Sequence, residues 1–279
     1  MSAYLYIVAT PIGNLEDLSA RAIATLRSVS LIAAEDTRHA ARLLSAYQIE
    51  TPVTACHDHN ESFKLTQLLG KLQQGKSVAL ISDAGTPLIS DPGYRLVKAA
   101  HEAGIRVIPI PGACAAITAL CASGLASDRF SFEGFLPAKT HARQQTLTSL
   151  ASDSRTLIFY EAPHRIIDSL QDMLTCFGAA RDVTFARELT KTFETIKKST
   201  LGELLAFVQA DPNQQKGEIV LVVAGASEAE QLPDTAKTDQ LLQRLMQDLP
   251  LKTAAQLAAD LTGLKKNELY QRALALKNL

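Results

Sequence analysis

Short apolar runs alternate with longer segments of helical periodicity over residues 4–112. Apolar and β-branched residues gather in Tyr4–Thr10, Leu31–Glu35, Pro52–His57, Ser77–Ser82 and Arg106–Pro111. Between these runs, apolar residues recur at a helical spacing in Leu15–Val29, Thr37–Tyr47, Glu61–Gln74 and Gly93–Ala103. Apolar strands separated by amphipathic helices are typical of βαβ units, so this region is predicted to form a mostly parallel sheet.

The alternation continues beyond residue 113 with a different connection pattern. Strands are predicted at Phe130–Phe135, Thr156–Glu161, Asp182–Glu188, Phe193–Thr200 and Glu218–Ala224. Helices are predicted at Ala113–Ser123, His141–Leu150, His164–Phe177 and Leu201–Gln209. The third and fourth strands are separated only by a Leu-Thr-Lys-Thr link, which is typical of an antiparallel hairpin. The second sheet is therefore predicted to be mixed.

The last part of the chain is set apart by a polar segment. Residues 226–236 contain Pro233 and lack periodicity, which indicates a linker. Helical patterns then follow at Asp239–Asp248, Thr253–Leu261 and Lys266–Leu276. These boundaries predict an α/β domain over residues 1–112, a second α/β domain over 113–226 and a helical unit over 237–279.

Charge and cysteine usage narrow the class of protein. The net charge of −1 differs from the strongly basic balance of many nucleic-acid binders, so only a local basic patch is expected. The four cysteines lie in apolar runs without paired spacing, which favours reduced thiols and a cytoplasmic location. No apolar stretch reaches the ~20 residues of a membrane span, and the first residues lack the pattern of a signal peptide.

Three loops at predicted strand ends carry the candidate chemistry. They are Val-Ala-Thr-Pro-Ile-Gly-Asn at 8–14, a Gly- and Pro-rich loop at 82–93, and the small-residue turn at 109–119. Ligands of open α/β sheets bind at the carboxyl ends of the strands, so these loops are candidate ligand-binding segments. The structural alternatives for these three segments are, in the same order, an ordinary βα turn, a capping loop and close packing of a helix on the sheet. No G-x-G-x-x-G fingerprint or P-loop occurs, which argues against a dinucleotide or nucleoside-triphosphate site.

Several longer motifs in one order carry a family resemblance over residues 4–225. They are the segments at 10–17 (TPIGNLED), 33–39 (AAEDTRH), 57–61 (HDHNE), 82–93 (SDAGTPLISDPG), 133–139 (EGFLPAK), 159–165 (FYEAPHR) and 186–194 (ARELTKTFE). The sequence resembles the tetrapyrrole methylase superfamily, the class III methyltransferases, and within it the members that modify ribosomal RNA.

The resemblance implies a fold, a cofactor and a reaction. It implies two α/β domains of the tetrapyrrole-methylase type with the cofactor cleft between them, and a small C-terminal helical extension similar to a helix-turn-helix. The cofactor is S-adenosyl-L-methionine and the reaction is 2′-O-methylation of a cytidine ribose in 16S ribosomal RNA. The implied substrate is this RNA within the small ribosomal subunit, and the implied oligomeric state is a homodimer. The implied cofactor-binding residues are Pro11, Gly13, Asp83, Gly85, Thr86, Pro87, Ile89, Ser90, Ala115, Ala116, Phe159, Tyr160, Leu189 and Ile219.

The reaction needs groups that orient a ribose hydroxyl or accept its proton. Acidic candidates follow two strands, in Glu35-Asp36 and in Asp58 and Glu61, and Lys191 is a candidate for orienting the hydroxyl or a phosphate. Of these, Asp36, Glu61 and Lys191 are the expected catalytic residues. The alternative is a structural ion-pair set formed by Glu35, Asp36 and Arg38.

Cationic side chains are candidates for phosphate contacts. In the α/β domains the expected RNA-binding residues are Arg38, Lys139, Arg143 and Arg165, with His39, His164 and Arg187 as further candidates. In the helical unit they are Lys265, Lys266 and Arg272. A solvated charged surface, or a hairpin that packs on the enzyme or a partner, is the alternative. The His57-Asp58-His59 segment lacks an identifiable third ligand, so no metal site is expected.

Two rival functions remain beside RNA methylation. One is a small-molecule methylase acting on a tetrapyrrole-type substrate with the same fold. The other is a non-enzymatic RNA-binding or scaffold protein that keeps the cofactor cleft. The basic C-terminal unit and the motifs at 35–39 and 57–61 favour RNA methylation, and the intact Gly- and Pro-rich loops disfavour the scaffold.

Overall fold

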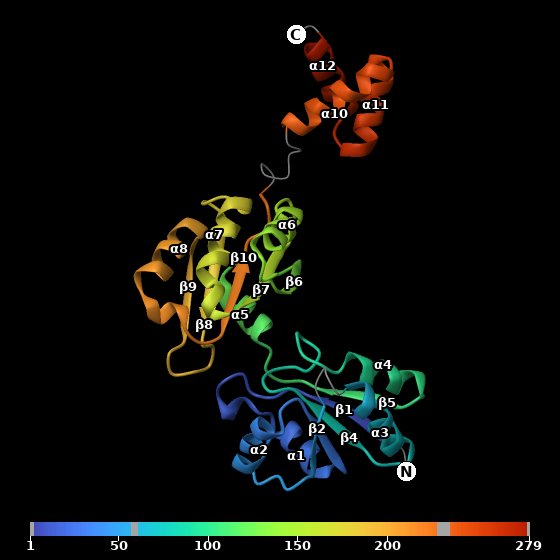
Figure 1. Cartoon of the computed structure of the whole chain (residues 1–279), viewed down its shortest axis with the longest axis vertical. Coiled ribbons are helices and arrows are strands. Elements are labelled where there is room, and N and C mark those ends of the chain that lie inside the picture. The colour runs from blue at the N-terminus through green and yellow to red at the C-terminus, as the bar shows by residue number, and fades with distance from the viewer. Residues whose placement is uncertain (1–2, 57–60, 228–234, 278–279) are drawn as a thin grey trace. The chain divides into compact units, whose positions relative to one another are not determined.

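A computed structural model describes residues 3–56, 61–227 and 235–277 (Figure 1). The chain divides into two compact units, one comprising Met1–Ala151 with Arg155–Ala224 and the other Ser152–Ser154 with Gly225–Leu279. In the residues that the structure describes, the larger unit contains two five-stranded sheets and the smaller one contains three helices.

The first sheet is parallel throughout, as predicted. Its strand order is β3-β2-β4-β1-β5, formed by β1 (Tyr4–Val8), β2 (Leu31–Ala34), β3 (Val53–Ala55), β4 (Val78–Ile81) and β5 (Arg106–Ile110). β2 and β4 are buried on both faces, which explains their uninterrupted apolar runs. Because all strands run the same way, the loops that follow them emerge at one edge of the sheet.

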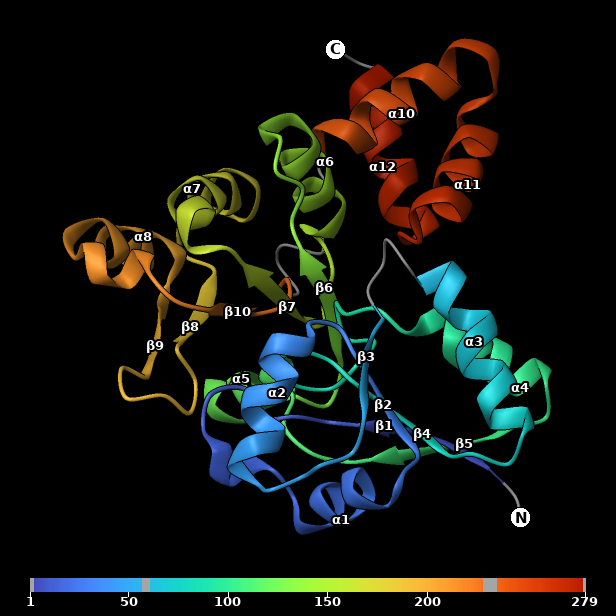
Figure 2. The same cartoon turned by 60° about the horizontal axis from the view of Figure 1, so that its bottom comes forward.

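Helices cover both faces of this sheet (Figure 2). Leu26 of α1 (Ala20–Ser28) and Leu44 of α2 (Thr37–Ala46) pack with Ile32 and Ile81 on one face. The helices α3 (Glu61–Gln73) and α4 (Tyr94–Glu102) pack on the other through Leu68, Leu72, Leu96 and Ala100. Each helix presents one apolar stripe to the sheet, as the periodicity predicts.

The predicted single helix over Leu15–Val29 is wrong at its start. The structure has a 3-10 turn, η1 (Leu15–Asp17), followed by an extended Leu18 and then α1. The side chain of Ser19 accepts a hydrogen bond from the backbone N–H of Ala22. This is an N-cap, and it restarts the helix inside a run whose apolar spacing alone shows no break.

The second sheet is mixed, as predicted, with the order β6-β7-β10-β8-β9. Its strands are β6 (Phe130–Phe135), β7 (Thr156–Glu161), β8 (Asp182–Arg187), β9 (Thr195–Thr200) and β10 (Ile219–Val223). β6 and β7 are parallel, whereas β10 is antiparallel to both of its neighbours. The predicted antiparallel hairpin is confirmed, because β8 pairs with β9 from Asp182 opposite Thr200 to Arg187 opposite Thr195.

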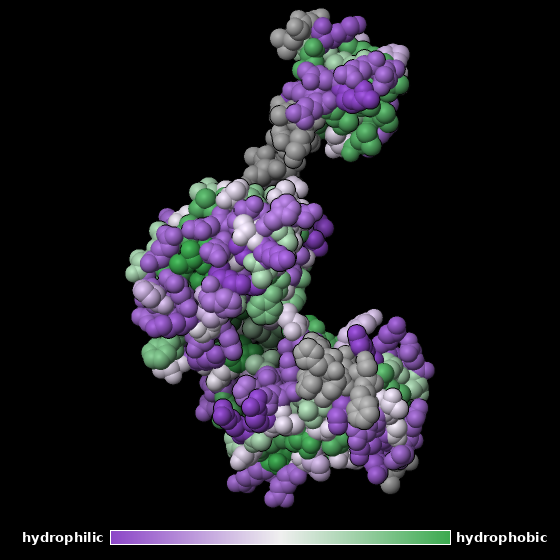
Figure 3. All heavy atoms as spheres, viewed as in Figure 1, coloured by the Kyte–Doolittle hydropathy of each residue, from purple (hydrophilic) through white to green (hydrophobic). Residues whose placement is uncertain are grey.

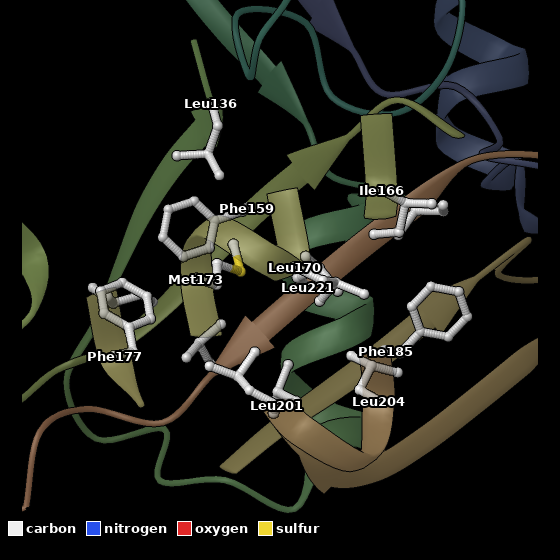
Figure 4. Close-up of a cluster of buried hydrophobic side chains, with 14 of the residues drawn as sticks. Leu136, Phe159, Ile166, Leu170, Met173, Phe177, Phe185, Leu201, Leu204 and Leu221 are labelled. Atoms are coloured by element: carbon white, nitrogen blue, oxygen red, sulfur yellow. The ribbon is translucent and has the colours of Figure 1, made fainter. Parts of the chain in front are cut away.

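Two different layers cover the second sheet. The helices α6 (Thr140–Leu150), α7 (Ile166–Phe177) and α8 (Leu201–Ala210) bury the larger core, a single cluster that contains Phe159, Met173 and Phe185 (Figure 4). α5 (Ala115–Ser123) covers the opposite face through Ala116, Ala119 and Leu120. Ile12 of the loop after β1 belongs to this second cluster, so α5 and that loop share one apolar contact region.

The described part of the smaller unit is a three-helix bundle, which confirms the predicted C-terminal helical extension. It comprises α10 (Thr235–Asp248), α11 (Leu251–Thr262) and α12 (Lys266–Lys277) around buried Leu242, Ala255, Ala258, Leu269 and Ala273. α11 ends at Gly263 with φ of +71°, a left-handed C-cap that glycine adopts readily. Apolar side chains remain on the surface over α11, among them Leu257 and Leu261 (Figure 3).

None of the helices in the described part of the chain combines the length and apolar character required to cross a membrane.

Candidate functional site

A cavity of about 380 Å³ opens within the larger unit, at the carboxyl ends of the parallel strands. The loops after β1, β4 and β5 contribute Ile12, Ala84, Gly85, Thr86, Ile89, Ser90, Asp91, Cys114 and Ala115. The second sheet and its loops contribute Phe135, Tyr160, Glu161, Ala162, Pro163, Ala186, Leu189, Gly217, Glu218, Ile219 and Val220. The volume lies in the range of small-molecule sites, ~300–1,000 Å³. Apolar walls with a few polar groups suit a mixed-polarity ligand.

Backbone bridges hold the three loops of the first sheet together. Thr10 N–H donates to the Gly85 carbonyl at 2.8 Å, and Gly85 N–H donates back to the Thr10 carbonyl at 3.0 Å. The hydroxyl of Thr86 donates to the Ala113 carbonyl at 2.9 Å. The loops after β1, β4 and β5 are therefore one rigid rim rather than three independent turns.

Backbone strain concentrates in two loops at this cavity. In the described residues, Leu88, Ser90, Glu188 and Thr190 adopt positive φ angles of 52–73°, and Gln48 is the remaining non-glycine residue that does so. Such conformations are unfavourable for L-residues and persist where surrounding contacts impose them, often at functional sites. The loops 82–93 and 188–191 therefore have the backbone signature of a binding site.

The start of α5 faces the cavity without a side-chain cap. Cys114 occupies the N-cap position and makes no capping hydrogen bond, and Ala115 lines the cavity. Ala116 N–H donates to the phenolic oxygen of Tyr160 at 3.2 Å. Burial raises the pKa of Tyr160, so the phenol stays neutral. Uncapped N–H groups at a helix start are suited to an anionic group.

Strand alternation separates two neighbouring residues that the resemblance implied together. Tyr160 lines the cavity, whereas the side chain of Phe159 is fully buried in the core on the opposite face of the sheet. Among the implied cofactor-binding residues, the cavity lining contains Gly85, Thr86, Ile89, Ser90, Ala115, Tyr160, Leu189 and Ile219. Pro11, Gly13, Asp83, Pro87 and Ala116 lie in the same loops and helix but are not among the lining residues.

Glu161 lines the cavity with a buried carboxylate that the sequence analysis did not select. Its Oε1 accepts hydrogen bonds from Arg165 Nη2 at 2.6 Å and from Ala162 N–H at 2.7 Å, and its Oε2 accepts from Ser169. Arg165 also donates to the Leu136 carbonyl. The sequence predicted that Arg165 contacts phosphate. Its guanidinium is instead bonded inside the protein, where it holds the 162–165 turn that forms one cavity wall.

Lys191 lies between two carboxylates beside the cavity. Its Nζ donates to Glu188 Oε1 and to Glu218 Oε2, each at 2.9 Å, and Glu218 is a lining residue. Partial burial lowers the pKa of Lys191, but these two hydrogen bonds outweigh burial and raise it above its ordinary value. Lys191 is therefore a fixed cation at the rim.

Asp36 is held by the arginine two residues along. Arg38 Nη2 donates to Asp36 Oδ2 at 2.6 Å and Arg38 Nε to Oδ1 at 3.1 Å. The hydrogen bonds from Arg38 lower the pKa of Asp36 far below its ordinary value. Asp36 N–H in turn donates to Asp83 Oδ1 at 3.0 Å, and His39 Nδ1 lies 3.1 Å from Asp83 Oδ2. The ion-pair alternative for Asp36 and Arg38 is thus the observed arrangement.

The remaining cationic candidates divide into exposed and internal residues. Lys139, His164 and Lys265 are exposed. Arg143 is buried, donating to Asp172 Oδ2 at 2.6 Å, so it is not a surface phosphate contact. Arg187 is likewise buried against Gln214 and the Phe193 carbonyl. These corrections have one cause: long-range partners that sequence order does not reveal.

In the helical unit, Lys266 is half-buried, and Arg272 pairs with Asp239. The residues His57, Asp58 and His59, and the side chain of Glu61, lie outside the described part of the chain. Within that described part, no group of three or more His, Cys, Asp or Glu side chains is arranged to hold a metal ion.

Comparison with known proteins gives family matches for both the α/β part and the helical part of the chain. Residues 4–205 match the tetrapyrrole (corrin/porphyrin) methylases, and residues 233–277 match the RsmI C-terminal HTH domain. The ribosomal RNA small subunit methyltransferase I of Escherichia coli O157:H7 is 57% identical over 97% of this chain and 94% of its own length. The chain belongs to the ribosomal RNA small subunit methyltransferase I family, and it is a methyltransferase. The protein of that name from Haemophilus influenzae is 55% identical over 99% of this chain and 98% of its own length.

Solved structures extend this family's fold to distant relatives. The uroporphyrin-III-C-methyltransferase from Thermus thermophilus aligns with a TM-score of 0.57 at 18% identity, covering 80% of this chain and 94% of that one. A putative diphthine synthase from Entamoeba histolytica aligns with a TM-score of 0.58 at 16% identity, covering 82% and 96%. At these identities the likeness concerns the fold alone. It confirms the predicted tetrapyrrole-methylase architecture with two α/β sheets.

Proposed function

We propose that this methyltransferase transfers a methyl group from S-adenosyl-L-methionine to the 2′-hydroxyl of a cytidine ribose in 16S ribosomal RNA. Family membership supports ribosomal RNA of the small subunit as the substrate, since the relatives at 50–57% identity carry that name. The cytidine and the ribose oxygen follow from the resemblance of the motifs at 10–17, 33–39 and 82–93.

The cavity at the carboxyl edge of the first sheet is the observation that carries the assignment of the methyl donor. Its volume of about 380 Å³ and its apolar walls suit a nucleoside joined to an amino acid. The uncapped start of α5 suits the donor's carboxylate, and the carboxylates of Asp91 and Glu218 at the lining suit its ammonium group. Tyr160 and Phe135 supply aromatic faces, which attract a cation such as a sulfonium.

The donor supplies a methyl group already activated on a positively charged sulfur. The lining residues that hold it are chiefly Gly85, Thr86, Ile89, Ser90, Ala115, Tyr160, Leu189 and Ile219. Pro11, Gly13, Asp83, Pro87, Ala116 and Phe159 belong to the loops, helix and strand that carry these residues. Lys191 remains charged between Glu188 and Glu218, which suits a role in orienting the ribose or an adjacent phosphate. Asp36, through Arg38, organises the rim, and Glu61 remains a candidate at the start of α3.

RNA contacts are proposed for exposed cations on both units. The side chain of Arg38 is 87% exposed although it pairs with Asp36, and Lys139 is exposed just before α6. In the helical unit, Lys265 and Lys266 at the start of α12 are the proposed RNA contacts. Arg272 holds α12 against α10 through its pair with Asp239. The proposed substrate is the assembled small subunit in the cytoplasm, and the proposed enzyme is a homodimer. Each chain is divided into domains 1–112, 113–226 and 237–279.

A substrate comparison tests the proposal. Purified protein and radiolabelled S-adenosyl-L-methionine are offered to unmodified small subunits, to naked 16S RNA and to a tetrapyrrole precursor. The proposal predicts label in subunits or RNA that nuclease digestion releases on a ribose-methylated nucleoside. Label on the tetrapyrrole alone identifies a small-molecule methylase, and donor binding without transfer to any substrate identifies a scaffold. Either result overturns the proposed function.

A further inference from the structure

His39 and Asp83 form a side-chain pair next to the loop that lines the cavity, and sequence spacing did not show this pair. His39 lies in the first turn of α2, and Asp83 follows β4 after Ser82. The distance from His39 Nδ1 to Asp83 Oδ2 is 3.1 Å. A carboxylate only accepts hydrogen bonds, so Nδ1 carries the hydrogen in this contact. In the neutral imidazole, Nε2 then holds a lone pair and is a base.

A chain of contacts fixes the orientation of this imidazole. Asp83 Oδ1 accepts a hydrogen bond from Asp36 N–H at 3.0 Å while Oδ2 holds His39. Asp36 is itself clamped by Arg38 through two nitrogens. A base whose second ring nitrogen is held by an anchored carboxylate is the arrangement that nucleophile-activating sites share.

The pair also lies where a bulky substrate can reach it. The His39 side chain is 56% exposed, so the imidazole is accessible to a partner larger than the cavity holds. Asp83 is followed directly by Ala84 and Gly85, both of which line the cavity. Gly85 is bonded to Thr10 across the rim, so the segment that carries Asp83 is fixed relative to the cavity wall.

We propose that His39, oriented by Asp83, is the general base that accepts the proton of the ribose 2′-hydroxyl. This role rests on the proposed function. In the transfer step a bond forms between the ribose oxygen and the methyl carbon while the bond from that carbon to sulfur breaks. The electron pair of the broken bond stays on sulfur, which becomes a neutral thioether. The hydroxyl proton moves to Nε2 of His39, and the carboxylate of Asp83 stabilises the resulting imidazolium.

The neighbouring titratable groups are less suited to this task. Hydrogen bonds from Arg38 lower the pKa of Asp36, which makes its carboxylate a weak base. Lys191 is protonated between its two carboxylates. Among the residues that the structure describes, the charged groups near His39 include Asp83 from the loop after β4 and Asp36 from its own segment, the latter paired with Arg38.

The competing role for His39 is a protonated contact to an RNA phosphate. The two roles predict opposite pH responses. A base loses activity as pH falls and it becomes protonated, whereas a phosphate-binding imidazolium loses subunit affinity as pH rises. Substitution separates them further, because a base contributes to the rate of transfer and a phosphate contact to the affinity for the subunit.

The tautomer of His39 is a test that needs no turnover. Nitrogen-15 spectra of the full chain, with His39→Gln identifying the signal, are expected to show a neutral ring protonated at Nδ1. Asp83→Asn is expected to change that tautomer distribution. A ring protonated at Nε2 overturns the proposal, because no lone pair then faces the substrate.

Single-turnover transfer to unmodified small subunits tests the base directly. For His39→Gln we expect a rate at least about 100-fold below wild type, with affinities for S-adenosyl-L-methionine and for the subunit within about threefold. The acid limb of the pH–rate profile is lost in this variant, and added imidazole restores part of the rate of His39→Ala. His101→Gln, at an exposed histidine in the last turn of α4, is the matched control and retains the wild-type rate.

The outcomes separate this proposal from the proposed function. An active wild type with His39→Gln within threefold of it overturns the base and leaves RNA methylation intact. Loss of subunit affinity equal to the loss of rate also overturns it, in favour of the phosphate contact. A wild type that labels neither subunits nor RNA overturns the proposed function, and the base with it.

Discussion

Gly13 and Lys191 approach so closely that a side chain at residue 13 has no space. A Cβ built on Gly13 would lie 2.5 Å from Lys191 Cγ, 2.8 Å from Thr190 Oγ1 and 3.0 Å from the Leu189 carbonyl oxygen. The loop after β1 therefore rests on the strained 188–191 loop, which carries one cavity-lining residue and the cation at the rim. The missing side chain at Gly13 is what lets the two loops meet.

Gly13→Ala is predicted to displace the 188–191 loop. We expect overpacking to reduce stability by about 1–3 kcal/mol and to weaken the affinity for S-adenosyl-L-methionine by about tenfold or more. Calorimetric titration and urea unfolding measure the two effects. Gly70→Ala is the control: its Cβ meets nothing within 4 Å inside α3, so donor affinity is unchanged and stability rises by roughly 0.5–1 kcal/mol. Equal donor affinity in both variants contradicts this account of Gly13.

Arg143→Met is predicted to destabilise the fold rather than to weaken RNA binding. Removing the guanidinium leaves the Asp172 carboxylate, 9% exposed, without its ion-pair partner. The expected loss is about 3–5 kcal/mol, measured by urea unfolding. Lys139→Met is expected to change stability by less than about 0.5 kcal/mol and to weaken subunit binding. A stable Arg143→Met protein with reduced subunit affinity contradicts the internal role.

Glu188 is predicted to stabilise the protein in a pH-dependent way. Burial raises the pKa of its carboxyl, but hydrogen bonds from Lys191 and from Glu218 N–H outweigh burial and hold it below the ordinary 4.5. A carboxyl whose pKa is lower in the folded than in the unfolded protein stabilises the fold at pH values above its unfolded-state pKa. This stabilisation is lost as pH falls through its folded-state pKa.

The difference in unfolding free energy between wild type and Glu188→Gln is therefore expected to be constant above about pH 5 and to shrink as pH falls further. Urea titrations across this range measure it. Glu102→Gln, which removes an exposed pair with Lys98 at 3.9 Å, is the control with a difference near zero throughout. A Glu188→Gln difference that grows toward acid pH has the wrong sign for this account.

Tyr160→Phe is predicted to weaken donor binding without unfolding the protein. The substitution keeps the ring at the cavity wall but removes the acceptor of the Ala116 N–H and the phenolic donor. One lost hydrogen bond of about 0.5–1.5 kcal/mol corresponds to a roughly two- to tenfold weaker affinity. Equilibrium dialysis with the labelled donor checks the value, and an unchanged affinity contradicts the placement of Tyr160 in the donor site.

Local patterns determined much of this architecture. The alternation of β-rich and helix-period segments predicted both sheets because each strand and helix buries its own apolar residues locally. The antiparallel β8–β9 hairpin was predictable from its short link. The break at Leu18 and Ser19 was not, since a capping hydrogen bond rather than apolar spacing decides it.

Side-chain partners far apart in sequence escaped prediction. Arg143 with Asp172, and His39 with Asp83, are separated by 29 and 44 positions, so their pairing depends on the assembled sheets. Glu161 was missed for a different reason: its partners Arg165 and Ser169 are near in sequence, but the strand, turn and helix that bring them together are not marked by a motif. The loops that line the cavity were found because glycine, proline and strand ends mark them in the sequence.

The most direct test of the central claim is the identity of the methylated nucleoside. Unmodified small subunits are incubated with the enzyme and S-adenosyl-L-methionine carrying a heavy methyl group, and the 16S RNA is digested and analysed by mass spectrometry. The account predicts the heavy methyl on the ribose of cytidine, in 2′-O-methylcytidine. A heavy methyl found only on a base, or no incorporation into RNA by protein that binds the donor, would contradict it.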